Sequence, residues 1–200
     1  MHPMSKQPTT ILLCGVGGQG TILAADLLAK AALAAGQDVK VSEIHGMAQR
    51  GGSVTTVVRV GEDVHSMVAD KGEVDILASF ELTEAMRYID YLKEGGLLIS
   101  NDESIKPMPV LTGVASMPAD SRGYLLDLGA ILVPALNIAR EAGNSRTQNV
   151  VLLGALSVRL PIPVETWDEV IAKRVPPKTV ETNLKAFAAG RAFALEHEDE

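Results

Sequence analysis

Cysteine and histidine are scarce in this sequence of 200 residues. Cys14 is the single cysteine, so the chain by itself can form no disulfide framework, no cysteine-based zinc site and no iron–sulfur cluster. The four histidines are scattered and include no His-x-x-x-His pair, which argues against a metal site. Redox or metal chemistry, if the protein takes part in any, must therefore rely on groups held elsewhere.

Positive charge and long apolar runs are also lacking. The net charge of −7 gives no positive field for nucleic-acid phosphates, which argues against a general nucleic-acid binder. The longest charge-free stretches are far shorter than the roughly 20 residues that a bilayer requires. The first ten residues are polar, and glycines interrupt the apolar run that follows, so we expect neither a signal peptide nor a membrane segment. These features favour a cytoplasmic location.

Strand and helix signals alternate along the first two thirds of the chain. The short apolar run at 11–14 stops at glycines and is typical of a buried parallel strand, and the Ala- and Leu-rich segment 21–35 predicts a helix ended by Gly36. The pattern predicts an α/β fold with a mostly parallel doubly wound sheet, helices on both faces and a helical C-terminal third, in a single domain over 1–200. Further strands are expected at 39–44, 53–60, 74–80, 97–100 and 110–117, a turn at 95–96, and helices at 82–93, 128–142, 149–158, 165–174 and 179–198.

The glycine-rich segment 15–20 fits the pattern G-x-G-x-x-G between a strand and a helix. Glycines permit a tight turn and a close approach of the backbone, and a helix N-terminus offers free N–H groups to a phosphate or carboxylate. Glu43 follows at the spacing of the acid that holds ribose hydroxyls in dinucleotide-binding folds. NAD or FAD binding is therefore open, as is a purely structural turn. A long polar loop after Glu43, and the lack of a hydride-transfer motif, weigh against NAD.

The second glycine-containing loop, 45–53, combines groups suited to an anionic ligand or a partner surface. Arg50 can donate two hydrogen bonds to a carboxylate or phosphate, and Gly51 allows the backbone to approach a ligand. His45 could donate a proton, although a structural histidine fits equally well. An exposed loop with a solvated arginine is the alternative.

The two loops together resemble the gamma-type domain of the pyruvate/2-oxoacid:ferredoxin oxidoreductase family. The resemblance rests on Gly-Val-Gly-Gly-Gln-Gly-Thr at 15–21 and Ser-Glu-Ile-His-Gly-Met-Ala-Gln-Arg-Gly-Gly-Ser-Val at 42–54. It continues through 75–85, 95–101 and 149–155 and reaches 183–190, so it spans nearly the whole chain. Within the family, the chain most resembles free-standing small subunits of enzymes that act on aryl pyruvates such as indolepyruvate.

The resemblance implies a subunit that supports the oxidative decarboxylation of a 2-oxoacid to an acyl-coenzyme A, with ferredoxin as electron acceptor. The chain has no Gly-Asp-Gly…Asn-Asn thiamine motif and only one cysteine. Thiamine diphosphate and the Fe–S clusters are therefore expected in a larger alpha subunit, and coenzyme A at a site shared with it. Isolated, the chain is expected to be inactive and could form a homodimer. The sequence does not fix the 2-oxoacid.

The same resemblance directs attention to residues that would face the shared site. Glu81 joins them because it follows a strand at its carboxyl end, where open sheets bind ligands. His45 is the one catalytic candidate, and no metal ligand is expected. The cofactor-binding candidates are Gly15, Gly17, Gly18, Gln19, Gly20, Met47, Arg50, Gly51 and Glu81.

Two other functions remain open from the residues alone. A stand-alone NAD- or FAD-dependent oxidoreductase would bind its cofactor without a partner. A stand-alone binding module for coenzyme A or a nucleotide would bind its ligand without turnover.

Overall fold

A computed structural model describes residues 7–45 and 52–197, and it contains a six-stranded sheet in the order β2-β3-β1-β4-β5-β6. Strands β1, β4, β5 and β6 pair in parallel, whereas β3 is antiparallel to both β1 and β2. Only β3 therefore runs against the other five strands, which confirms the mostly parallel sheet. The strands are β1 Thr9–Val16, β2 Asp38–His45, β3 Ser53–Gly61, β4 Val74–Ser79, β5 Leu92–Asn101 and β6 Ile131–Val133.

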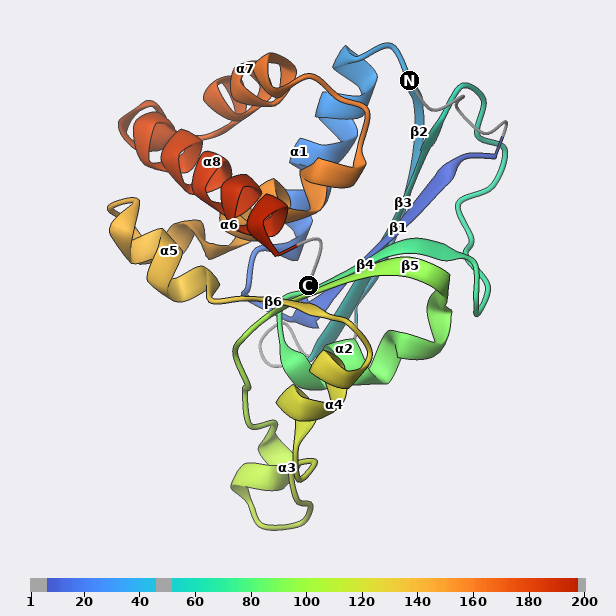
Figure 1. The fold of residues 1–200 in the computed structure, drawn as a ribbon, viewed down its shortest axis with the longest axis vertical. Coiled ribbons are helices and arrows are strands. Elements are labelled where there is room, and N and C mark those ends of the chain that lie inside the picture. Colours follow the sequence, from blue (N-terminus) through green and yellow to red (C-terminus); the bar gives the residue numbers. More distant parts are fainter. Residues whose placement is uncertain (1–6, 46–51, 198–200) are drawn as a thin grey trace.

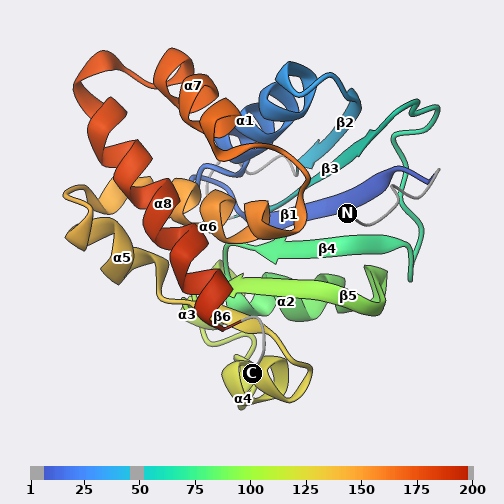
Figure 2. The same cartoon turned by 45° about the horizontal axis from the view of Figure 1, so that its top comes forward.

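Helices cover both faces of this sheet, as Figures 1 and 2 show. One face carries α1 and the C-terminal helices α5 to α8, and the other carries α2 and α4. The helices are α1 Thr21–Ala34, α2 Leu82–Tyr88, α3 Met108–Leu111, α4 Ser121–Asp127, α5 Ala135–Glu141, α6 Gln148–Leu156, α7 Val164–Arg174 and α8 Val180–Glu196, with short 3-10 turns at Ile89–Tyr91, Ser145–Thr147, Ser157–Arg159 and Pro177–Thr179.

Strand β1 lies inside the sheet and is buried on both faces. Ile11 and Leu13 belong to the larger apolar cluster under α1 and the C-terminal helices, whereas Leu12 and Cys14 belong to the smaller cluster under α2 and α4. A strand covered on both sides needs apolar side chains at every position, which is why the short run at 11–14 identified it correctly. In the part of the chain that the structure describes, no helix has both the length and the apolar character needed to cross a membrane.

Helices α6 and α8 cross with direct contact between their backbones. A Cβ atom added to Gly154 would overlap the carbonyl oxygen of Phe187, and one added to Gly190 would overlap the carbonyl oxygen of Val151. Only glycine permits this approach. The crossing buries Phe187 against Trp167 of α7, whose rings lie 5.4 Å apart between centroids.

The segment between β5 and α6 differs from the prediction. The expected helix 128–142 is wrong: strand β6 and then α5 occupy it, since Ile131–Val133 is a short apolar run buried in the sheet, where periodicity cannot separate strand from helix. The expected strand 110–117 is also wrong, because α3 and an exposed irregular segment stand there.

The region from α2 to β5 also differs in its bounds. Helix α2 ends at Tyr88 rather than at 93, and the expected turn at Gly95 and Gly96 lies inside β5. The pairing of β5 with β4 shifts register between Val74 and Ile76, so the two glycines accommodate an irregularity of the strand rather than a chain reversal.

Candidate functional site

The glycine-rich segment 15–20 forms a turn that Gln19 ties to the end of β4. The side-chain oxygen of Gln19 accepts a hydrogen bond from the Val16 N–H at 2.8 Å, and its amide nitrogen donates to the carbonyl oxygen of Phe80, also at 2.8 Å. The backbone N–H of Gln19 donates to the Val16 carbonyl at 3.1 Å. Gln19 therefore uses both ends of its side chain to hold the turn.

The glycines of this turn serve different purposes. A Cβ at Gly15 would lie 2.8 Å from the Cβ of Phe80, and one at Gly20 would lie 2.7 Å from Nδ2 of Asn149, so close packing requires both. Gly18 has a φ of +105° and nothing within 4 Å on its open side. Gly18 alone among these three faces free space.

The N–H of Gly17 brings the two glycine-containing loops together. It donates to the carbonyl oxygen of Gly52 at 2.9 Å, and Gly52 directly precedes β3. The end of the second loop at Gly52 is thus adjacent to the glycine turn, and the shared site stays a prediction. Met47, Arg50 and Gly51 lie outside the described residues, and for His45 only the backbone is described, at the end of β2.

A cavity of about 570 Å³ opens beside the glycine turn at the carboxyl ends of β1, β4 and β5. Open α/β sheets bind their ligands at this edge, and the volume lies in the range of ordinary small-molecule sites, about 300–1,000 Å³. Its wall combines the turn with the segment that joins α5 to α6. The lining residues are Gly18, Gln19, Phe80, Asn101, Glu103, Ile105, Leu136, Arg140, Ser145, Arg146, Gln148 and Leu152.

Two arginines of this wall carry charge that no acid among the described residues neutralises. Arg140 and Arg146 are exposed and form no ion pair or side-chain hydrogen bond with the described residues. Among the other described lysines and arginines, only Lys106 and Lys178 also lack an ion pair or a side-chain hydrogen bond. In a chain of net charge −7, two free guanidinium groups at one cavity indicate an anionic ligand.

Sequence reasoning missed Arg140 and Arg146. The segment 128–142 was predicted as one continuous helix, and this prediction did not place Arg140 at the carboxyl edge of the sheet. The available signal was the pair of arginines around a Gly-Asn-Ser turn just before an apolar helix. That signal points to a ligand site only when the pairing of β6 with β5 is known, because this pairing brings the turn to the edge of the sheet.

Glu81 is buried and its carboxylate is already occupied by the chain. One carboxylate oxygen accepts from the N–H of Glu84 at 2.8 Å and caps α2, and the other accepts from the N–H of Ile105 at 2.9 Å. These two bonds join α2 to the segment after β5. The ligand role predicted for Glu81 stays a prediction, and the structure adds a positioning role.

A second cleft, of about 340 Å³, lies on the other side of Ile105, which lines both spaces. Its floor includes Glu84, whose carboxylate accepts from Ser53 and pairs with Arg87 at 3.1 Å. The unpaired Lys106 also lines this cleft, together with the bonded carboxylates of Glu81 and Glu84. Lys106 is therefore the lining charge of the cleft that the described residues leave unpaired.

Cys14 is a core residue at the end of the run 11–14 that was predicted as a buried strand. Burial raises the pKa of its thiol to about 12, and the carboxylates of Glu84 and Glu81 act in the same direction. The thiol contacts the carbonyl oxygen of Glu84 at 3.6 Å. Such a thiol is neutral at physiological pH and unsuited to nucleophilic or redox chemistry. Across residues 7–45 and 52–197, no three His, Cys, Asp or Glu side chains are grouped to hold a metal ion.

Glu43 does not sit where a dinucleotide-binding fold would place its acid. In that fold the second strand neighbours the first, but here β3 lies between β1 and β2. The insertion moves Glu43 one strand, about 4.8 Å, further from the glycine turn. This topology weighs against the NAD and FAD alternatives.

Comparison with known proteins identifies relatives over nearly the whole chain. Residues 10–193 match the family described as pyruvate ferredoxin/flavodoxin oxidoreductase. The chain is 47% identical over 193 residues to the indolepyruvate oxidoreductase subunit IorB of Thermococcus kodakarensis, a match that covers 93% of this chain and 96% of that subunit.

Two solved structures share the fold. The gamma subunit of a keto/oxoacid ferredoxin oxidoreductase from Geobacter sulfurreducens matches with a TM-score of 0.70 at 27% identity, over 94% of this chain and 99% of that one. A 2-oxoglutarate:ferredoxin oxidoreductase from Magnetococcus marinus, solved with 2-oxoglutarate, coenzyme A and succinyl-CoA bound, matches with a TM-score of 0.73 at 24% identity. There, 96% of this chain corresponds to 32% of the longer chain.

Proposed function

The chain belongs to the pyruvate ferredoxin/flavodoxin oxidoreductase family, and from this premise we propose that it is the small subunit of an indolepyruvate:ferredoxin oxidoreductase. The reaction converts an aryl pyruvate and coenzyme A to an acyl-coenzyme A and CO₂, releasing one proton and passing two electrons to ferredoxin. The proposal treats the whole chain as one gamma-type domain. It also includes a cytoplasmic location. The identity to IorB subunits over more than nine tenths of the chain supports the substrate class.

We propose that this chain itself binds coenzyme A, and the cavity beside the glycine turn is the main observation that supports this role. Coenzyme A bears a pyrophosphate and a 3′-phosphate, and guanidinium groups bind phosphate through paired, charge-assisted hydrogen bonds. Arg140 and Arg146 are free to form such bonds, and Gly18 leaves the backbone open to the ligand. Arg50, Met47 and Gly51, on the loop that reaches Gly17 through Gly52, are proposed as further contacts.

A larger partner subunit is needed for the remaining chemistry. With Cys14 as its only cysteine, buried and with a raised pKa, this chain offers no ligands for Fe–S clusters. We assign the clusters and thiamine diphosphate, which supplies the carbon nucleophile for decarboxylation, to that subunit. The contribution of this chain is to orient coenzyme A by its phosphates and to direct its thiol towards the shared site.

The arginines provide the test, in the enzyme assembled from both subunits. Arg140→Gln and Arg146→Gln each remove one phosphate donor at an exposed site, so we expect each to raise the apparent KM for coenzyme A about 5- to 10-fold, which corresponds to roughly 1 kcal/mol. The KM for the 2-oxoacid should stay unchanged. The matched control is Lys178→Gln, which removes an equally unpaired cation that does not line the cavity.

Either an unchanged KM for coenzyme A in both arginine variants, or an equal rise in Lys178→Gln, would overturn the assignment of the cavity. The loss of an electrostatic contact also predicts a salt dependence: the wild-type KM for coenzyme A should rise with ionic strength, and the rise should be smaller in the variants.

A further inference from the structure

Residues 104–118 form an arm that projects between β5 and α4. The arm contains α3 and stands at one end of the longest axis of the molecule (Figure 1). Lys106 is its only charged residue, although charged residues make up 22% of the chain and about three would be expected. The side chains of Met108, Leu111 and Val114 are 67%, 63% and 82% exposed. An exposed segment with so little charge is unlike an ordinary solvated loop.

The arm is an ordered structure rather than a loose connection. The N–H of Leu111 donates to the carbonyl of Pro107 at 3.0 Å, and the N–H of Val114 donates to the carbonyl of Pro109 at 2.8 Å. At the base of the arm, the buried carboxylate of Glu81 accepts from Ile105. Its apolar side chains are therefore held outward in a fixed arrangement, which lowers the entropy cost of binding a partner.

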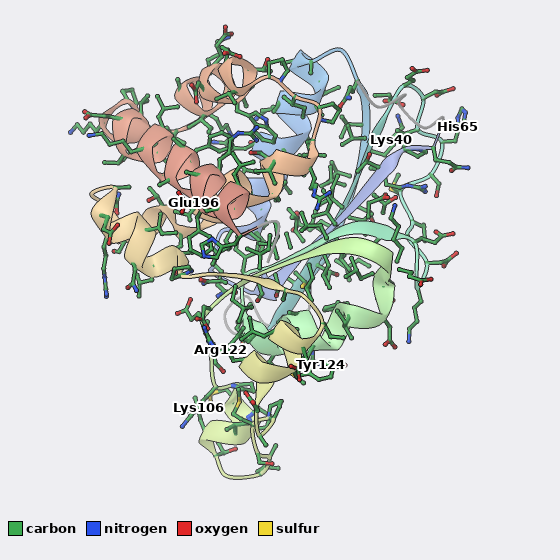
Figure 3. The ribbon with its side chains drawn as sticks, in the orientation of Figure 1. Lys40, His65, Lys106, Arg122, Tyr124 and Glu196 are labelled. Atoms are coloured by element: carbon green, nitrogen blue, oxygen red, sulfur yellow. The ribbon has the colours of Figure 1, made fainter. Side chains whose placement is uncertain are left out.

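The cleft beneath the arm has the features of a pocket for an anchoring side chain. Met108, Leu111 and Val16 are among its apolar lining residues. Two polar groups there lack partners: the Thr83 hydroxyl oxygen is buried without a hydrogen bond, and the Lys106 ammonium group, labelled in Figure 3, is unpaired. The carboxylates of Glu81 and Glu84, which also line the cleft, are already bonded within the chain. Lys106 is therefore left to receive a carboxylate that closely follows an apolar side chain.

We propose that the arm and its cleft are the docking surface for the larger, thiamine- and Fe–S-carrying subunit, which inserts an apolar side chain with a neighbouring acid beneath Met108 and Leu111. This inference rests on the proposed function. Interfaces are poor in charged residues and rich in methionine at their centres, as the arm is. The fold recurs as about a third of a longer oxidoreductase chain, so it is compatible with being packed against further domains of such an enzyme.

The position of the arm favours this occupant over a second copy of the chain. Ile105, at the base of the arm, lines both the cleft and the coenzyme A cavity. A larger subunit docked here would bring its reaction centre next to the bound coenzyme A. A second copy would cover the same edge without supplying the thiamine diphosphate and clusters that the reaction needs, and would add another chain of net charge −7.

The test measures the affinity of the purified chain for the larger subunit by calorimetry. Leu111→Asp and Val114→Asp place a desolvated charge in the proposed contact, and each should raise the Kd at least about 30-fold, as loss of an interface hot spot does. Both positions are exposed, so the free variants should keep the wild-type circular dichroism and Tm. The matched control is Val68→Asp, since Val68 is also 63% exposed and lies in the irregular segment between β3 and β4; its Kd should stay within about 2-fold.

Each outcome separates the inference from the proposed function. Wild-type affinity in both arm variants would overturn the docking surface while leaving the function intact. Failure of the wild-type chain to bind the larger subunit would overturn the proposed function itself. If sedimentation shows a dimer of the isolated chain that Leu111→Asp dissociates, while binding to the larger subunit is unaffected, a second copy is the occupant and the inference is wrong. Lys106→Glu should weaken the complex and make the loss smaller at high salt.

Discussion

Replacing Gly154 with alanine should destabilise the protein, although helix propensity predicts the opposite. Alanine is favoured over glycine in a helix interior by about 1 kcal/mol. The new Cβ, however, would overlap the carbonyl oxygen of Phe187 and lie 3.0 Å from the backbone nitrogen of Arg191 in α8. Neither atom can rotate away as a flexible side chain would, so α6 and α8 must separate.

A separation of roughly 1 Å is enough to lose a quarter to a half of the dispersion attraction at each contact along the crossing. The affected side chains include Val151, Phe187 and Trp167, all fully buried. Overpacking of a core costs about 1–3 kcal/mol, and the upper end, about 3 kcal/mol, applies here because the new Cβ meets backbone atoms. After the gain of about 1 kcal/mol in helix propensity is subtracted, we expect a net loss of about 2 kcal/mol, which lowers the Tm by roughly 4–8 °C in a chain of this size.

Thermal unfolding followed by circular dichroism measures the effect. Gly190→Ala should behave alike, because its Cβ would overlap the carbonyl oxygen of Val151. Ala188→Gly, at an exposed position of the same helix α8, is the control for propensity and should cost about 1 kcal/mol. An increase in Tm for Gly154→Ala or Gly190→Ala would refute the close backbone crossing.

Three further predictions concern the site. Gln19→Ala leaves the Val16 N–H without its partner and leaves the Phe80 carbonyl with only the bond from Asn101 at 3.3 Å, so it should lower the free energy of unfolding by about 1–3 kcal/mol in urea titrations. Glu81→Gln turns an amide group towards one of two backbone donors and should cost about 1–3 kcal/mol, a loss that an unchanged unfolding midpoint would contradict. Cys14 should resist iodoacetamide at pH 8 until the protein unfolds. Because the pKa of the folded thiol is raised to about 12, the thiol contributes fully to the free energy of unfolding below its unfolded pKa of about 8.5. This contribution declines as the pH rises towards 12.

The first part of the fold could be predicted because its signals are local. The strand at 11–14 is buried on both faces, so every residue in it is apolar, and the glycines at 15 and 20 are required by contacts with Phe80 and Asn149. The order of the strands in the sheet could not be predicted from local sequence patterns. The insertion of β3 between β1 and β2 depends on pairing across the loop 45–52, which no periodicity specifies.

The segment 104–146 was predicted poorly for two physical reasons. Residues 131–133 are too few to show a strand period, and they merged with the apolar start of α5 into one apparent helix. The apolar residues of the arm resemble a strand in sequence, yet they are exposed on α3 and beyond it. Arg140 and Arg146 were missed as a consequence, since their meeting at the cavity depends on both features.

The most direct test of the account is reconstitution of the enzyme under anaerobic conditions from this chain and the proposed larger subunit. The account predicts that each subunit alone is inactive and that the mixture reduces ferredoxin with indolepyruvate only when coenzyme A is present. It also predicts no binding of NADH or FAD to the isolated chain. Activity of the larger subunit alone with an unaltered KM for coenzyme A, or turnover by this chain with NAD, would contradict it.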